Sequence, residues 1–546
     1  MSAKAVFGAL TCRDEQRRGR PVDVGGVPST GLVDDVLAGR ESDGRRAAVG
    51  HLLVQRDPAR RAQHDFAAAR VHFPDVPGFG ERVHRHQPAL DAVVGVAFGV
   101  PAIPAHLAGE LWFHLCGRPQ AEVDRMSTDI GRALAHGDQY CARLRTARLG
   151  AVTVAGVAIL DIDVDLWSDA ELVDPYPTYA RLRRLGRVLY SPQWDAYVVP
   201  GYDEVRHVLQ GWETFSSASG VGLNARANSM SGCGILTTDP PLHDSRRRVL
   251  NAQLVPREIS RHHELLVDEA ERLVSSVVEA GTFDAVADLA HPYSVRVVSD
   301  LCGLPEEGRE HLIERASAAF NTFGPDNELC RRSWQGFEDL YDYATNFATP
   351  ERLAPGRWGT EIYQAATDGI VEPAACPGLV LAYTWAGMDT TVNAIASAIS
   401  LFADHPDQWT VLRSDRSLLV SATNEVLRIE PPVQRFTRIT TREAELAGEI
   451  IPADARVAVL FGSANRDERR FVDPDRFDIR RNPLDHLSFG RGVHRCVGAG
   501  LAQEEIKAVL SALADRVERF DVVDREWRRN NALHGLERLR VEVERA

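Results

Sequence analysis

The sequence predicts a mainly α-helical fold with small β-sheets, and three observations support this prediction. Residues 379–402 form an apolar run of about six helical turns, long enough to cross the core of a large domain. From about residue 161 onward, segments of helical length with one apolar face recur along the chain. Only short runs with strand-like alternation lie between these segments.

The expected elements follow from the same patterns. Helices are expected over residues 176–185, 202–209, 260–280, 379–402, 417–430 and 499–517. Short strands are expected within residues 188–199, around the Ser191-Pro192 turn, and within 444–460, with a turn at 452–454. The fifth helix should end at Pro431-Pro432, because proline cannot continue a helix.

The composition excludes several classes of protein. The chain has 546 residues, of which 44% are hydrophobic and 26% charged, as in ordinary globular proteins. Its net charge of -14 argues against a general nucleic-acid binder. The eight cysteines show no framework spacing, and the most apolar stretch, 90–113, is interrupted by Pro101, Pro104 and Glu110. We therefore expect a cytoplasmic protein with no membrane and no nucleic-acid partner.

Residues 1–155 differ from the rest of the chain. They are rich in Arg, Gly, Ala and His and show little helical or alternating periodicity. Local signals that agree with one another are expected of a foldable unit, and they are scarce here. We expect this N-terminal extension to be disordered or to be upstream sequence translated from a misassigned start. A true extra domain is the alternative.

The run Phe489–Gly498 contains one cysteine, Cys496, among three glycines and behind an aromatic residue. Glycine has no Cβ, so the backbone can approach a flat, bulky group closely. Such a setting suits a thiolate that ligates haem iron. The alternative is an ordinary buried thiol or a redox pair, but no second cysteine lies nearby in the sequence to form a CxxC site.

The long apolar helix contains a polar interruption, Ala386-Gly387-Met388-Asp389-Thr390-Thr391. A threonine can donate to the carbonyl four residues earlier and loosen the helix, and Gly387 weakens it further. An acid–alcohol pair at Asp389 and Thr390 could relay protons to bound dioxygen. The alternative is a polar patch on an exposed face, which the apolar neighbours make less attractive.

Two further groups of charged residues have a spacing that indicates a shared role. Glu425 and Arg428 are spaced to share one helix face, and the run Phe471–Phe477 offers a second arginine, Arg476, to the same carboxylate. A buried triad of this kind would define geometry more than add stability. His243 and Arg247 lie one helical turn apart and could clamp a carboxylate of a cofactor; a solvated basic start of a helix is the alternative.

In this order, the motifs resemble the cytochrome P-450 superfamily over residues 160–546. The resemblance implies the P-450 fold, with haem b between the long helix and the cysteine loop, so that residues 156–546 form the haem domain. By matching position, Cys496 is the expected iron ligand, and Asp389 and Thr390 are the expected catalytic pair. The resemblance also implies haem contacts from His243, Arg247, Arg438, His494, Phe489, Gly490, Gly498 and Ala386.

Segments 216–223, 320–325 and 530–537 are similar to bacterial P-450s that oxidise para-substituted benzoates such as 4-methoxybenzoate. Those enzymes hold the substrate carboxylate with polar residues of one loop, where Arg226 and Ser229 stand here, and of the central helix. On that helix this chain departs from the group, because Ala382 and Trp385 replace small hydroxyl residues and Trp385 narrows the pocket. The other substrate contacts that the resemblance implies are Val221, Phe323, Val433, Phe436 and Leu533.

The resemblance implies a monooxygenase that hydroxylates or O-dealkylates an aromatic substrate, with O₂ as co-substrate. The chain contains no flavin or iron–sulfur motif, so electrons from NAD(P)H are expected through a separate ferredoxin and ferredoxin reductase. A basic docking patch for an acidic ferredoxin is expected from Arg246, Arg248, Arg491 and Arg495. A peroxide-driven P-450, against which Asp389 and Thr390 argue, and a non-catalytic haem-binding sensor are the alternatives.

Overall fold

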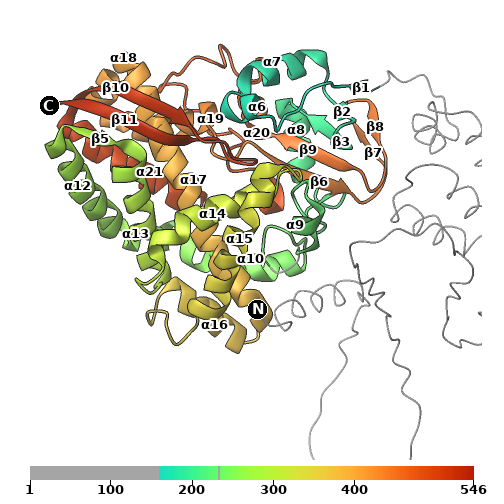
Figure 1. The fold of residues 1–546 in the computed structure, drawn as a ribbon, viewed down its shortest axis with the longest axis horizontal. Helices are drawn as coiled ribbons and strands as arrows, with labels where there is room; N and C mark the ends of the chain where they lie inside the picture. Colours follow the sequence, from blue (N-terminus) through green and yellow to red (C-terminus); the bar gives the residue numbers. More distant parts are fainter. Residues whose placement is uncertain (1–158, 231–233) are drawn as a thin grey trace, which may run out of the picture. The chain divides into compact units, whose positions relative to one another are not determined.

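The computed structural model describes residues 159–230 and 234–546. Within them the fold is mainly helical with small sheets, as predicted. The prediction for residues 1–155 lies outside the described residues. In Figure 1, helices α12 (His263–Ala280) and α13 (His291–Cys302) lie on one side and the strands of the largest sheet on the other, with α17 (Cys376–Asp404) between them.

The largest sheet has six strands in the order β1-β2-β3-β9-β6-β4. Its strands are β1 (Leu160–Asp161), β2 (Leu189–Ser191), β3 (Ala196–Val199), β9 (Arg456–Leu460), β6 (Arg435–Thr440) and β4 (Phe215–Ser216). Strand β6 pairs antiparallel with β9, with Phe436 opposite Val459. Alternation along β6 therefore sends Arg435, Thr437 and Ile439 to one face of the sheet and Phe436 and Arg438 to the other.

The second sheet is dominated by a C-terminal hairpin. Strands β10 (Val517–Trp527) and β11 (Leu536–Arg545) pair antiparallel, and β5 (Thr282–Asp284) adds to β11. A small hairpin joins β7 (Ala444–Leu446) to β8 (Glu449–Ile451). The connection between β10 and β11 runs into the molecule, because Leu533 forms an isolated bridge with Val433. This connection therefore places residues 528–535 beside the segment that leads into β6.

The remaining helices surround α17. They are α6 (Asp169–Val173), α7 (Tyr176–Leu185), α8 (Tyr202–Gln210), α9 (Ala225–Ser229), α10 (Leu242–Leu254), α11 (Pro256–Arg261), α14 (Leu312–Asn321), α15 (Glu328–Asp342), α16 (Trp358–Thr367), α18 (Pro406–Ser414), α19 (Leu419–Ile429), α20 (Phe461–Ala464) and α21 (Ala499–Arg516). The six helices expected from the sequence are all present, with ends that differ by a few residues. The long hairpin and helices α6, α9, α11, α13–α16, α18 and α20 were not predicted.

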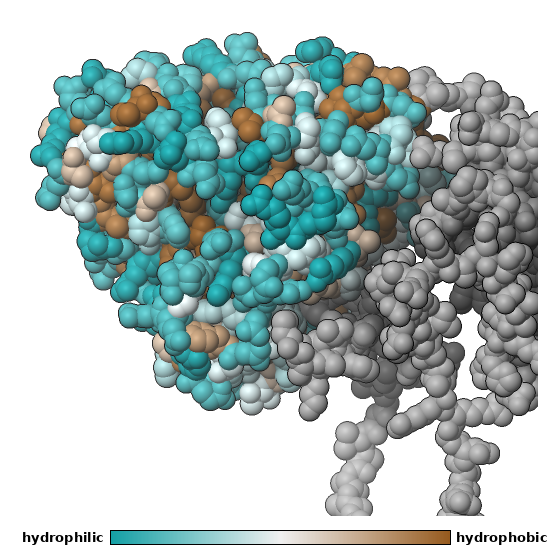
Figure 2. Space-filling model, viewed as in Figure 1, coloured by the Kyte–Doolittle hydropathy of each residue, from teal (hydrophilic) through white to brown (hydrophobic). Residues whose placement is uncertain are grey.

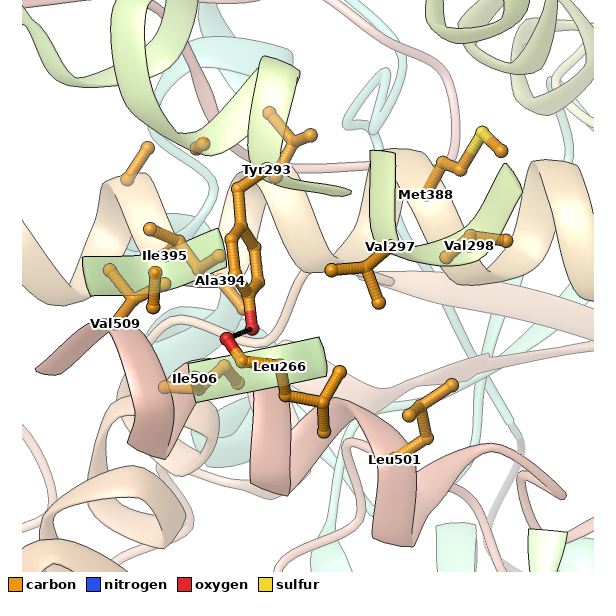
Figure 3. Close-up of a cluster of buried hydrophobic side chains, with 14 of the residues drawn as sticks. Leu266, Tyr293, Val297, Val298, Met388, Ala394, Ile395, Leu501, Ile506 and Val509 are labelled. Atoms are coloured by element: carbon orange, nitrogen blue, oxygen red, sulfur yellow. Dashed lines mark hydrogen bonds between the residues drawn. The ribbon is translucent and has the colours of Figure 1, made fainter. Parts of the chain in front are cut away.

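The core packs α17 against its neighbours. Figure 3 shows Tyr293 and Val297 of α13 beside Ile395 of α17 and Ile506 of α21. The Tyr293 hydroxyl donates to the Leu266 carbonyl of α12 across 3.2 Å, so the ring spans the core without leaving its polar end unpaired. Burying each large aliphatic side chain contributes about 1.5–3 kcal/mol. This packing fixes the positions of α17 and α21 relative to each other.

The exposed side chains of the described residues include both polar and large hydrophobic ones. The face visible in Figure 2 is mostly hydrophilic, with apolar side chains in small separate areas. Val472 and Leu484 are among the exposed large hydrophobic residues. Across residues 159–230 and 234–546, no helix is both long and apolar enough to cross a bilayer.

Candidate active site

A cavity of about 810 Å³ lies between α17 and the loop that carries Cys496. One wall comes from α17, through Ala386, Gly387 and Thr390, and the opposite wall from residues 488–498. Segments from α9, α10, α14, α15, α21 and β6 are among the others that add to the lining. Most of the lining is apolar, with a few charged side chains at separate places, as is usual for sites that bind small organic molecules.

The cysteine loop presents its sulfur to this cavity. Gly490 and Gly492 have φ values of 64° and 71°, a left-handed conformation that favours glycine, and a Cβ on Gly492 would lie 2.5 Å from the Leu209 carbonyl oxygen. The chain therefore folds back, and the Cys496 amide donates to the Phe489 carbonyl across 2.8 Å. Among the cysteines that the structure describes, Cys496 is exposed and lines the cavity, whereas Cys302, Cys330 and Cys376 are buried.

The surroundings of the Cys496 sulfur act on its ionisation in opposite directions. The Cys496 thiol is open to the cavity but lies deep within the protein, and its removal from bulk water raises its pKa. The Gly498 amide and the guanidinium groups of Arg247 and Arg495 partly offset this rise, because they favour the thiolate. Helix α21 starts at Ala499, directly after Gly498, so the positive end of its dipole lies three residues after Cys496 in the chain. These groups are suited to hold an anionic sulfur at the cavity wall.

Four basic side chains that the sequence predicted together, those of His243, Arg247, Arg438 and His494, line one end of the cavity. The His243 and His494 rings lie 4.6 Å apart. Burial lowers the pKa of Arg438 to about 10, and its only hydrogen bond given by the structure goes to the Thr437 carbonyl. The buried Nε2 of His243 has no partner. The buried Arg438 guanidinium is costly unless an anion is bound beside it, and the Nε2 of His243 can donate to the same anion when the ring is protonated.

Asp239 lies beside the basic end of the cavity and contacts one of its side chains, that of His494. The His494 Nε2 lies 3.4 Å from its Oδ1, and the Ser216 hydroxyl and Ser217 amide donate to the same carboxylate. Burial alone would raise the pKa of Asp239, but these hydrogen bonds lower it overall. The basic residues, the apolar walls and the exposed sulfur together fit a flat, doubly acidic cofactor with a metal that accepts a thiolate.

Asp389 and Thr390, the acid–alcohol pair of α17, have different surroundings. Thr390 lines the cavity, and its Oγ1 donates to the Ala386 carbonyl across 2.7 Å, as expected from the sequence. Asp389 is fully buried and does not line the cavity. Its Oδ1 accepts from Arg528 across 2.7 Å, and its Oδ2 has no partner. Sequence reasoning missed Arg528, which lies 139 positions away.

Most of the predicted substrate contacts lie at the cavity. Its lining includes Arg226, Ser229, Phe323, Ala382, Trp385, Val433 and Phe436. Trp385 and Phe323 have ring centroids 5.6 Å apart, and Phe323 stands edge-on to Phe436 at 5.8 Å. These three rings form an aromatic wall, which the sequence had anticipated only residue by residue.

Val221 and Leu533 are not among the residues that line the cavity, so their role as substrate contacts stays a prediction. Both side chains are buried elsewhere. The Val221 carbonyl accepts from the Thr437 amide across 2.7 Å, which ties it to β6. Leu533 packs with Phe320 and Ala532 behind the aromatic wall. They support lining residues and do not reach the cavity themselves.

The buried ion pair of α19 also differs from the prediction. Glu425 and Arg428 are fully buried and pair through two contacts of 2.8 and 2.9 Å. The second arginine at Glu425 is Arg481, at 3.1 Å, and not Arg476. The chain turns between Asp473 and Arg476, so the Arg476 carbonyl faces Arg428 while its exposed side chain lies 3.7 Å from Asp478.

Hydrogen bonds connect the Glu425–Arg428 ion pair to the segment that precedes the cysteine loop. Arg428 donates to the carbonyls of Asn465 and Pro474. The side chain of Asn465 donates to the Ser488 hydroxyl, which in turn donates to the Leu427 carbonyl. Ser488 directly precedes Phe489, so this network determines where the loop begins.

Glu505 is a second residue that the sequence did not reveal as part of the site. It lies on α21, lines the cavity and is buried, and its only hydrogen bond given by the structure comes from the Thr391 hydroxyl at 3.4 Å. Burial raises the pKa of Glu505 to about 8, and the Thr391 hydrogen bond opposes this rise. The sequence did not indicate a role for Glu505, because glutamates are common on helices and its position on α21 matches no motif.

The fold and the site are those of a mainly helical protein whose cavity fits a haem with a thiolate ligand. A cytochrome P-450 family model matches residues 377–530. The chain is 39% identical over 397 residues to cytochrome P-450 CYP199A2 of Rhodopseudomonas palustris, covering 71% of this chain and 95% of that one. It is 30% identical to the 6-deoxyerythronolide B hydroxylase of Saccharopolyspora erythraea, covering 70% and 98%. The chain therefore belongs to the cytochrome P-450 family.

Solved structures agree with this assignment. CYP109E1 from Bacillus megaterium in complex with testosterone is 27% identical and superposes with a TM-score of 0.63, covering 69% of this chain and 99% of that one. CYP109Q5 from Chondromyces apiculatus is 28% identical with a TM-score of 0.61, covering 71% and 99%. The protein is thus a P-450 monooxygenase that uses haem b, O₂ and NAD(P)H-derived electrons delivered by redox partners.

Proposed function

We propose that this monooxygenase hydroxylates or O-dealkylates an aromatic substrate, with electrons from a separate ferredoxin. The observation that carries the proposal is the aromatic wall of Phe323, Trp385 and Phe436 on the cavity. Aromatic rings prefer edge-to-face or offset contact with one another, which contributes about 0.5–1.5 kcal/mol beyond the area buried. Aromatic acids and their uncharged analogues are the classes to compare, because Arg226 and Ser229 also line the cavity.

The chain's own residues have distinct roles in this proposal. Cys496 ligates the iron, and the basic end formed by His243, Arg247, Arg438 and His494 binds the two propionates. When bound, the haem supplies the activation of O₂. Thr390 orients a proton donor at the cavity wall, and Asp389, one residue earlier on α17 and paired with Arg528, relays protons to it.

The substrate proposal is tested by titrating the holoenzyme with matched pairs of aromatic and saturated-ring compounds and following the haem absorption shift. Aromatic compounds are expected to bind more tightly and to give oxidised products by mass spectrometry. Trp385→Leu should reduce this discrimination about fivefold, which equals about 1 kcal/mol. Trp194→Leu, which removes an indole that packs on Trp167, is the control. Equal binding of both ring types would contradict the proposal.

The ligand assignment is tested separately. The reduced, CO-bound spectrum of the wild type is expected to show thiolate ligation, and Cys496→Ala should abolish it. Cys330→Ala is the matched control, because this buried cysteine contacts Asn224 and does not line the cavity. Retention of the thiolate spectrum in Cys496→Ala would overturn the assignment.

The expected docking patch for ferredoxin loses one of its members. Arg246 is buried and pairs with Glu372, so it is not accessible to a partner protein. Arg248 and Arg495 are exposed, and Arg491 is half-buried. These three arginines lie on or near the elements that hold the cysteine loop and are the proposed contacts for an acidic ferredoxin.

A further inference from the structure

Arg226, expected to bind a substrate carboxylate, already has a carboxylate partner in this chain. Its guanidinium donates to Glu338 Oε1 across 2.7 Å and stacks on Trp334, 4.0 Å from the ring centroid. Arg226 belongs to α9, whereas Glu338 and Trp334 belong to α15. Both charged residues line the cavity, so the ion pair joins two elements at the cavity itself.

The other polar groups at this end do not compensate for the occupied arginine. The Ser229 hydroxyl donates to the Arg226 carbonyl across 2.7 Å, so its hydrogen is engaged within α9. Asp342 lies one helical turn beyond Glu338 and also lines the cavity, which adds a second negative charge. On α17, Ala382 and Trp385 offer no hydroxyl group. A ligand carboxylate at this end of the cavity would lie near the carboxylates of Glu338 and Asp342 and near Arg226, which is already ion-paired.

We infer that Glu338 determines specificity by competing with a substrate carboxylate for Arg226, so that the pocket selects uncharged aromatic compounds over the corresponding acids. The inference rests on the proposed aromatic function. Glu338 is tethered beside Arg226, which gives it a high effective concentration that a free carboxylate must overcome. An incoming acid must also lose its hydration, whereas an uncharged analogue pays much less for desolvation.

The test uses 4-(imidazol-1-yl)benzoic acid and 4-(imidazol-1-yl)benzamide, two compounds of nearly equal shape that differ in charge at pH 7.5. Their imidazole nitrogen binds haem iron and gives an absorption shift, so dissociation constants can be measured without turnover. The wild-type holoenzyme is expected to bind the amide more tightly than the acid. Glu338→Gln should improve binding of the acid relative to the amide about fivefold, the upper range for an ion pair whose arginine is 56% exposed.

Two further variants separate competition for Arg226 from a general charge effect. Asp342→Asn removes the same unit of charge from the same helix, but Asp342 is bonded by Asn346 and not by Arg226. It should change the acid-to-amide ratio less than twofold. In Arg226→Gln, adding Glu338→Gln should give a much smaller improvement than it gives in the wild type. An unchanged ratio in Glu338→Gln, or an equal effect of Asp342→Asn, would overturn the inference.

This experiment and the test of the proposed function can fail independently. The imidazole probes report binding whether or not aromatic compounds are oxidised. If no aromatic compound is oxidised but Glu338→Gln changes the ratio as expected, the proposed reaction fails and the role of Glu338 stands. If aromatic compounds are oxidised but the ratio does not change, the role of Glu338 fails and the reaction stands.

Discussion

The carboxylate of Asp389 accepts a hydrogen bond from the guanidinium of Arg528 across 2.7 Å, in the interior beside α17. The arginine comes from the connection that follows β10, where its own amide donates to the Gly535 carbonyl. Asn393 contributes a second contact to both partners. The acid that is proposed to pass protons to Thr390 is therefore held by the C-terminal hairpin, and Arg528 acts as a positioning residue.

Replacing Arg528 is expected to disturb both stability and proton delivery. Arg528→Gln leaves a buried carboxylate without its charged partner, which should cost about 2–3 kcal/mol of unfolding free energy. The fraction of electrons that end in oxidised product should fall, and the solvent isotope effect on turnover should change. Arg525→Gln is the control, because Arg525 pairs with Asp404 at the surface, where such pairs contribute about 0–1 kcal/mol. If Arg528→Gln and Arg525→Gln change stability, product yield per electron and the isotope effect equally, Arg528 does not position Asp389.

The two arginines near Glu425 should differ in their contribution to stability. Arg481 contacts the fully buried Glu425, so Arg481→Ala should lower the free energy of unfolding by about 2 kcal/mol. The side chain of Arg476 is 64% exposed, and Arg476→Ala should cost at most about 0.5 kcal/mol. Urea denaturation followed by circular dichroism and by haem absorption measures both. A larger loss in Arg476→Ala would contradict the observed pairing.

The buried Glu505 predicts a dependence of stability on pH. Its folded-state pKa is raised to about 8, so between about pH 4.5 and 8 the folded protein retains a proton that the unfolded chain has released. Stability should therefore be greatest below this interval and fall as pH rises through it, by at most about 1.4 kcal/mol per pH unit. Glu505→Gln should flatten the dependence, measured by denaturation at pH 5.5, 6.5 and 7.5.

Glu504 supplies the control for this prediction. It is the preceding residue on α21 and pairs with Lys507 near the surface. Glu504→Gln should retain the wild-type slope of stability against pH. If Glu505→Gln also retains that slope, another group is responsible.

Electron delivery by an acidic ferredoxin should depend on Arg248. This exposed residue lies on α10 outside the cavity, so Arg248→Glu should not disturb the haem site. The bimolecular rate of haem reduction at low salt should fall about tenfold, and the difference should shrink as ionic strength rises. Arg519→Glu, a charge reversal at an exposed arginine of β10, is the control. Stopped-flow reduction with no difference between the variants would refute the docking site.

Much of the site could be predicted because its signals are local in sequence. Gly490 and Gly492, which precede Cys496, have positive φ values, a conformation that their lack of a Cβ permits, whereas Gly498 does not. The apolar run of α17 formed the expected long helix, and Thr390 bonds back to Ala386 within it. His243, Arg247 and His494 could be grouped because the family motifs place them around one cofactor.

Contacts between distant segments could not be predicted in the same way. Arg528 and Asp389 are separated by 139 positions, and Arg226 and Glu338 by 112. Many arginines could satisfy either acid, so composition and spacing do not select a partner. The exclusion of Val221 and Leu533 from the cavity likewise depends on how β6 and the hairpin connection pack.

The sequence by itself determined the class of this protein: a helical P-450 haem enzyme with Cys496, Asp389 and Thr390 in their expected segments. The helices follow from periodicity, whereas the class follows from the resemblance of motifs that each lie within one helix or loop. The tertiary structure alone decided which charges pair, placing Arg481 on Glu425, Arg528 on Asp389 and Glu338 on Arg226. Those pairs depend on packing between elements far apart in the chain, because an ion pair forms only where the fold brings both charges together.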